Sequence, residues 1–124
     1  MTRIHRQNLF FDIFCALLIC FPILFSPTSM LLGSEQVDVW NHSWGGFWWI
    51  NSLQEGSLPW HTTLLSWPNG GVLWFIDPIL ALISAPFALF SVAFGYNVTC
   101  FLYVCFASWS IRFFARALGA PRIG

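Results

Sequence analysis

The sequence predicts an all-α integral membrane protein with about three transmembrane helices and an amphipathic interfacial helix in the first outer loop. Composition is the first observation, since 57% of the 124 residues are hydrophobic and only 8% are charged. A soluble domain carries about 25% charged residues, which a fold of this size needs for its polar surface. The second observation is the pattern: apolar runs of helical length flank a stretch at residues 34–78 that is rich in acids and tryptophan.

The same composition excludes several function classes. The formal net charge is zero and the few basic residues lie near the two ends, so no basic stripe is available for a nucleic-acid partner. The four cysteines lie in apolar segments, in pairs whose spacing matches neither a Cys-x-x-Cys motif nor half of a zinc site. The sequence also lacks the Gly-rich loop of nucleotide-binding proteins and the Gly-x-Ser-x-Gly and His-Glu-x-x-His motifs of hydrolases.

We expect the first span within residues 9–32, after a short basic head at residues 2–8. Residues 9–25 alone would form about 25 Å of helix, at the short end for a crossing, and continuation toward Leu32 would lengthen it. A cleaved signal peptide is the alternative, but the segment after the apolar run lacks a small-x-small cleavage site. Asp12 would then lie near the inner interface, where an acid is tolerable.

The outer loop, residues 34–76, begins with a predicted amphipathic helix. Apolar residues recur there at spacings of three and four: Val37, Trp40, Trp44, Phe47 and Trp48. Polar residues share the other side: Glu35, Asp38, Asn41 and His42. Each set forms one face of a helix, so we expect this helix to lie in the interfacial plane, where tryptophan is favoured. Ser34 is the expected N-cap, Gly45-Gly46 would allow a division into two shorter helices, and Gly56 is the expected stop.

The rest of the chain predicts turns and two further spans. The second half of the outer loop contains turn-forming residues at Pro59, Pro68 and Asn69-Gly70-Gly71, so we expect turns there. The second span is expected at residues 78–94, opened by Asp77-Pro78 and kinked at Pro86. The third is expected at residues 97–116, after a tight connection at residues 95–97, with Gly119 as its stop.

This topology contains a conflict. Arg3 and Arg6 place the N-terminus in the cytoplasm by the positive-inside rule, which puts the outer loop on the extracytoplasmic side of a bacterial inner or plasma membrane. Three crossings then leave a second arginine cluster outside, against the same rule: Arg112, Arg116 and Arg122. We expect the N-terminal bias to prevail, with Arg112 in the last helical turn, where it reaches water or meets an acid.

Loose motifs spread over residues 8–124 resemble the N-terminal part of a bacterial polytopic GT-C-type membrane glycosyltransferase. They are, in chain order, Asp38 just past the first span, Leu53-Gln-Glu-Gly56-Ser-Leu-Pro59, Pro68-Asn-Gly70-Gly-Val-Leu73, Asp77-Pro78, Tyr96-Asn97 and Phe114-Ala-Arg116-Ala-Leu118-Gly119. The resemblance implies transfer of a sugar from a polyprenyl-phosphate carrier on the extracytoplasmic side. It also implies an essential acid in the first outer loop, and more spans than this sequence holds, so we expect the chain to be a fragment of a longer protein.

Asp38 is the candidate catalytic residue. A carboxylate can take the proton from the attacking hydroxyl in an inverting transfer. In a metal-dependent transfer, Glu35, Asp38 and His42 would be the candidate ligands, with a divalent cation as the cofactor near the leaving phosphate. The competing interpretation gives Glu35 and Asp38 a role at the helix N-terminus and leaves His42 as a solvated loop residue.

Trp44 and Trp60 are candidate substrate-binding residues, because aromatic rings can stack on the apolar face of a sugar. Membrane anchoring is the ordinary role of the tryptophans in such a loop. The partners expected on this interpretation are the lipid bilayer and a polyprenyl-phosphate-linked sugar. The alternative function is that of a non-catalytic small polytopic membrane protein, which acts as a scaffold or regulatory subunit.

Overall fold

The computed structural model describes residues 3–34, 36, 38–65, 68–72 and 77–120. The elements in chain order are α1 (Arg3–Ile19), the 3-10 helix η1 (Phe21–Phe25), α2 (Val39–Gln54), strands β1 (His61–Thr62) and β2 (Gly71–Val72), α3 (Pro78–Ala88) and α4 (Val92–Ala117). The prediction of an all-α fold is confirmed for the described residues, in which one two-residue strand pair is the only departure. The strands are antiparallel, with His61 opposite Val72 and Thr62 opposite Gly71.

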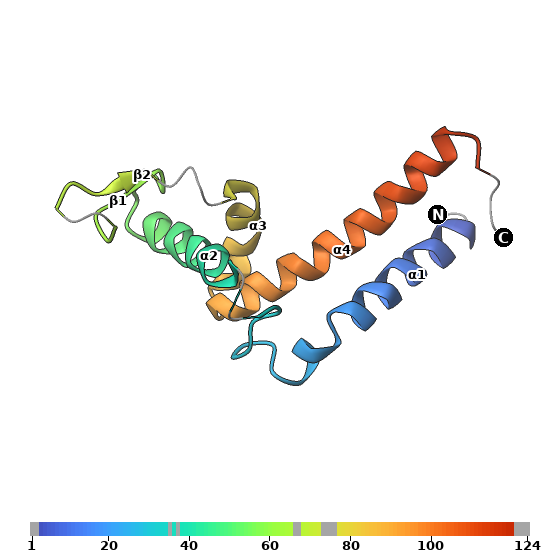
Figure 1. Cartoon of the computed structure of the whole chain (residues 1–124), viewed down its shortest axis with the longest axis horizontal. Helices are drawn as coiled ribbons and strands as arrows, with labels where there is room; N and C mark the ends of the chain where they lie inside the picture. Colours follow the sequence, from blue (N-terminus) through green and yellow to red (C-terminus); the bar gives the residue numbers. More distant parts are fainter. Residues whose placement is uncertain (1–2, 35, 37, 66–67, 73–76, 121–124) are drawn as a thin grey trace.

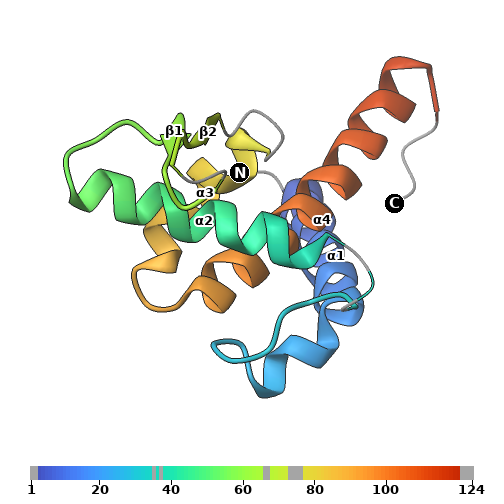
Figure 2. The same cartoon turned by 60° about the vertical axis from the view of Figure 1, so that its left-hand side comes forward.

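The helices form two groups (Figure 1). α1 and α4 run side by side in opposite directions, so the first turn of α1 and the last turn of α4 lie at the same end of the molecule. α2, α3 and the strand pair gather at the other end. There α2 runs across the beginning of α4 and packs against both α3 and α4, as the turned view also shows (Figure 2).

The first helical segment is shorter than the expected span at residues 9–32. α1 ends at Ile19, and η1 follows at Phe21–Phe25 with Pro22 in its first turn. Proline has no backbone N–H and disfavours helical geometry in the residue before it, so the α-helix stops before Pro22. The chain then turns through residues 26–34 to reach α2.

α2 is one continuous helix from Val39 to Gln54, and the Gly45-Gly46 pair does not divide it. The expected N-cap at Ser34 is wrong: Asp38 is the N-cap residue, and its carbonyl accepts from the backbone N–H of His42 at 3.2 Å. Ser34 Oγ instead accepts from the N–H of Gln36 in a local turn. The expected stop is confirmed, since Gly56 follows the helix with φ +69°.

α2 has a third face that the amphipathic pattern did not reveal. Val39, Ser43 and Gly46 are buried, although they belong to neither the aromatic nor the acidic set. At Gly46 a Cβ would lie 2.7 Å from Ser84 Oγ of α3, so the glycine allows the two helices to approach closely. The helix therefore packs on α3 through small residues, and Trp40 stays 61% exposed.

The boundary between α3 and α4 lies at a different place from the one expected between the second and third spans. α3 starts as predicted, because Asp77 Oδ1 accepts from the N–H groups of Ile79 at 3.0 Å and Leu80 at 3.1 Å. α3 ends at Ala88 instead of residue 94. α4 begins at Val92, capped by Ser91 Oγ, which accepts from the N–H of Phe94 at 3.0 Å.

The connection expected at residues 95–97 is therefore wrong, and these residues lie buried inside α4. Gly95 is needed for close packing: a Cβ there would be 2.8 Å from both the nitrogen of Ala88 and the oxygen of Ser84. The sequence analysis assigned Gly95 to a turn, whereas in the structure Gly95 allows close contact between two helices.

Among the described residues, α4 is the one helix long and apolar enough to cross a membrane. The apolar part of α1, residues 8–19, and the whole of α3 are shorter. α3 has 11 residues, or about 16 Å of helix, against about 30 Å of hydrocarbon in a bilayer. The crossing expected at residues 78–94 is not available to a helix of this length.

Candidate functional site

A pocket of about 910 Å³ lies at the end of the molecule where α2 crosses the start of α4. It is bounded by the chain segment after η1, by the first half of α2, by Leu65 and by the first turn of α4. Its lining residues are Thr28, Ser29, Met30, Leu31, Gly33, Ser34, Val39, Trp40, Asn41, Ser43, Trp44, Phe47, Leu65, Val92 and Ala93. The lining is mostly apolar. Its polar side chains are the hydroxyl groups of Thr28, Ser29, Ser34 and Ser43 and the amide of Asn41.

Asp38 does not line this pocket itself, but it is hydrogen-bonded to a residue that does. Its neighbour Val39 lines the pocket, and so does Asn41, whose side-chain Nδ2 donates to Asp38 Oδ1 at 3.0 Å. The carboxylate is exposed, and its side chain makes no capping bond to α2. The carboxylate of Asp38 is therefore exposed to water and held by the neutral amide of Asn41, which belongs to the pocket lining.

The three candidate metal ligands are not assembled in the part of the chain that the structure describes. Glu35 lies outside the described residues. His42 is half-buried, and its Nδ1 has no hydrogen-bond partner among the described groups. No group of three or more His, Cys, Asp or Glu side chains that could hold a metal ion occurs within the described residues.

The two candidate substrate-binding tryptophans lie at different places. Trp44 lines the pocket, and its ring stacks on that of Trp48 with centroids 5.9 Å apart. Trp60 lies past the other end of α2, where its ring meets Trp49 edge-on at 5.6 Å. Trp44 therefore lines the same pocket as Asn41, the hydrogen-bond partner of Asp38, whereas Trp60 lies apart. Trp40 and Phe47, which the sequence analysis assigned to the same helix face as Trp44, also line the pocket.

Asn97 positions one wall of the pocket, and sequence reasoning missed it. It is 1% exposed inside α4. Its Oδ1 accepts from the N–H of Leu32 at 2.9 Å, and its Nδ2 donates to the carbonyls of Pro27 at 2.9 Å and Met30 at 2.6 Å. One amide side chain thereby fixes the segment 27–32, four residues of which line the pocket. The available signal was an asparagine inside an apolar helix, where an unpaired amide is costly.

A second polar cluster lies at the far end of the α1–α4 pair. Arg112 of α4 forms a two-point ion pair with Asp12 of α1, in which both guanidinium NH groups donate to the carboxylate. Ser108 Oγ donates to the same carboxylate and accepts from Arg112. Asp12 is 3% exposed, so the expectation that Arg112 meets an acid is confirmed. This cluster joins two helices and lies far from the pocket.

The groups at the pocket end could bind an amphiphilic molecule and provide a carboxylate beside it. An exposed carboxylate can accept a proton or contact a cation, and the adjoining apolar lining with Trp40 and Trp44 can hold an amphiphilic molecule. No protein-family model, no curated protein and no solved structure matches the chain.

Proposed function

We propose that this chain is the N-terminal portion of a membrane glycosyltransferase that takes a sugar from a polyprenyl-phosphate carrier on the extracytoplasmic side. The observation that carries the proposal is the position of Asp38: an exposed carboxylate hydrogen-bonded to Asn41, which lines an apolar pocket together with Trp40 and Trp44. The resemblance of the loop motifs to GT-C-type enzymes supports it. In the proposed reaction Asp38 is the base that takes the proton of the acceptor hydroxyl.

The charges of the chain favour the metal-dependent form of this reaction. No lysine or arginine occurs between residues 7 and 111, so a carrier phosphate near the pocket meets no basic side chain from this stretch. A phosphate leaving group then needs another positive charge, which a divalent cation bound by carboxylate oxygen supplies. In the metal-dependent form Asp38 would contact such a cation, whereas in the metal-free form it would be the base.

The test exploits a matched pair of acids on α2. Asp38 and Glu55 are both exposed, and each accepts one bond of 3.0 Å from an asparagine of the same helix, Asn41 and Asn51 respectively. Asp38→Asn removes the charge at the pocket, and Glu55→Gln removes a similar charge at the other end of α2. We expect Asp38→Asn to lower turnover at least about 100-fold, the low end for a positioned general base, and Glu55→Gln to leave it unchanged.

The measurement is sugar transfer from a polyprenyl-phosphate hexose in membranes containing the full-length protein, with expression followed in parallel. Because Asp38 is exposed, the variant should accumulate to the level of the unmodified protein. Unchanged turnover for Asp38→Asn, or equal losses for both variants, would contradict the proposed role. A protein with no transfer activity at all would favour the scaffold function.

A further inference from the structure

The charged residues of this chain are segregated by sign. All five basic residues lie near the two ends of the sequence: Arg3, Arg6, Arg112, Arg116 and Arg122. Four of the five acids lie in the middle: Glu35, Asp38, Glu55 and Asp77. The fifth acid, Asp12, is neutralised by its ion pair with Arg112.

The fold brings the two basic ends together. α1 and α4 are antiparallel, so Arg3 and Arg6 in the first turns of α1 lie at the same end of the pair as Arg112 and Arg116 in the last turns of α4 (Figure 1). The described acids Asp38, Glu55 and Asp77 belong to the ends of α2 and the start of α3, at the opposite end. The molecule thus has an arginine end and an acidic end.

The distance between these ends matches a bilayer. Residues 92–111 of α4 contain no charged side chain and span about 30 Å as a helix, which equals the hydrocarbon thickness of a bilayer. In the other arm, the segment from Asp12 through η1 reaches Thr28, whose carbonyl accepts from Ser91 Oγ at 3.0 Å, just before α4 begins. The two helical arms of this hairpin are therefore linked at both ends of the uncharged stretch of α4, by the Asp12–Arg112 ion pair and by the Thr28–Ser91 hydrogen bond.

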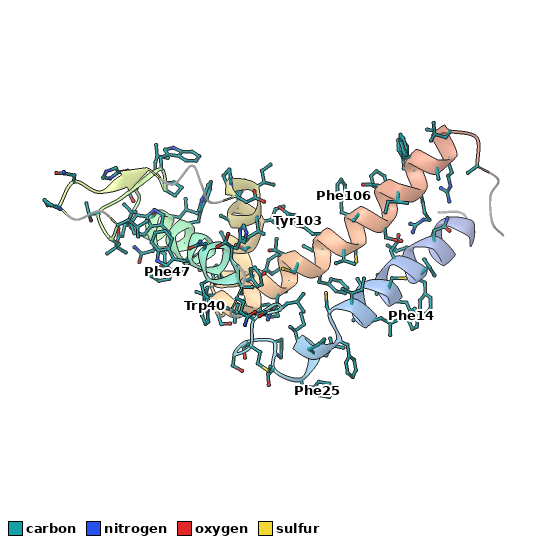
Figure 3. The ribbon with its side chains drawn as sticks, viewed as in Figure 1. Phe14, Phe25, Trp40, Phe47, Tyr103 and Phe106 are labelled. Atoms are coloured by element: carbon teal, nitrogen blue, oxygen red, sulfur yellow. The ribbon has the colours of Figure 1, made fainter. Side chains whose placement is uncertain are left out.

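The sides of the pair are covered with large apolar residues. Phe14 of α1 and Phe106 of α4 are 49% and 63% exposed, and they project from the outer sides of the two helices (Figure 3). On α4 the rings of Phe106, Trp109 and Phe113 stack in sequence at 5.6 Å steps. Water would disfavour such a surface, whereas acyl chains accommodate it.

We propose that α1 and α4 form a two-crossing hairpin in the membrane, with both arginine ends in the cytoplasm and with α2, the strand pair and α3 together on the extracytoplasmic face. The bilayer is the partner of the exposed α1–α4 surface. This arrangement replaces three crossings by two, and it removes the conflict with the positive-inside rule because all the described arginines then lie on the same side. It rests on the membrane location within the proposed function and is independent of the chemistry at Asp38.

Single-cysteine labelling of the full chain distinguishes two crossings from three. The four native cysteines are first replaced by alanine, and one cysteine is then introduced by Ser57→Cys or Ala120→Cys, both at exposed positions. A membrane-impermeant maleimide should label the Ser57→Cys protein in intact cells. The Ala120→Cys protein should react only after the membrane is opened, because residue 120 returns to the cytoplasm.

Labelling of the Ala120→Cys protein in intact cells would overturn the two-crossing hairpin, as would release of the protein from membranes by carbonate. A phosphatase that is active only outside the cytoplasm, fused after residue 124, gives an independent readout: inactivity is expected, and activity would overturn the proposal. Adding Asp38→Asn should leave every labelling result unchanged, so failure of the topology and failure of the catalytic proposal are separable.

Discussion

The two helix pairs of this molecule are held together in different ways. Where α2, α3 and the start of α4 meet, apolar side chains form a small core around Val39, Leu80 and Tyr96. In α1 and at the residue that follows it, by contrast, the buried residues are polar or small: Asp12, Ala16 and Cys20. The large apolar residues of the α1–α4 pair point outward.

This difference follows from the surroundings that each pair suits. In water, burial of apolar area supplies about 25 cal/mol per Å², so a pair of helices hides its large apolar residues between them. In lipid the tails are as apolar as leucine, and helices associate through small residues and polar contacts instead. The apolar core where α2, α3 and the start of α4 meet fits an aqueous or interfacial position, and the packing of α1 on α4 fits the proposed membrane hairpin.

The largest expected effect comes from breaking the polar tie between α1 and α4. Arg112→Leu leaves the carboxylate of Asp12 buried with Ser108 as its remaining described donor. Removal of one partner of a buried ion pair costs about 3–5 kcal/mol, and the 23% exposure of the Arg112 side chain favours the low end of about 3 kcal/mol. The measurement is the free energy of unfolding in detergent micelles.

The double variant Asp12→Leu/Arg112→Leu is the control for that experiment. It removes both charges, so it should recover most of the stability lost in Arg112→Leu. If the double variant were as unstable as the single one, packing around the two side chains would be the cause, and the ion pair would not distinguish the two helix pairs.

Close backbone contact at the junction of α3 and α4 gives the next largest effect. Gly95→Ala places a Cβ 2.8 Å from backbone atoms of Ser84 and Ala88, which cannot rotate away. We expect a loss of about 2 kcal/mol. Gly46→Ala should cost less, because the atom it meets is the hydroxyl of Ser84, which can turn.

Gly71→Ala is the matched control, since its nearest neighbouring atom is 3.9 Å away at Leu65 Cβ. The readout is the midpoint of thermal unfolding for the three glycine variants. The expected order of destabilisation is Gly95→Ala, then Gly46→Ala, then Gly71→Ala. Equal midpoints for all three would show that the α3–α4 junction is not closely packed.

The smallest of the three effects concerns the segment that Asn97 holds. Asn97→Leu removes the partner of two carbonyls and of the Leu32 N–H. Because Pro27 and Met30 are exposed, water can replace Asn97 at their carbonyls, so we expect a loss of about 1–2 kcal/mol. Hydrogen exchange at the Leu32 amide should accelerate. Thr99→Val is the control, because Thr99 is equally buried but its hydroxyl donates only within α4, to the carbonyl of Gly95.

A slow Leu32 amide in the Asn97→Leu variant would mean that the segment is held by other contacts. In that case the wall of the pocket would not depend on α4. Faster exchange in Thr99→Val as well would indicate a general loosening of the helix instead of a local release.

Several features of the fold could be predicted because they depend on residues close in sequence. The start of α3 at Asp77-Pro78 and the stops at Gly56 and Gly119 follow from local capping chemistry. The all-helical class follows from composition and periodicity. The aromatic face of α2 also follows from spacing alone, and it carries Trp40 and Trp44 into the pocket.

Other features depend on the tertiary structure, because the spacing of residues in the sequence does not determine them. Gly95 is equally suited to a turn and to a close helix contact, and only the approach of α3 assigns it to the second. Asp12 and Arg112 are 100 residues apart, and Asn97 lies 65 residues from Leu32, so neither partnership is visible until the helices are placed side by side. The same placement puts the two arginine ends together. Capping and periodicity act within about one or two turns of a helix, whereas the direction in which the chain returns depends on contacts between distant segments.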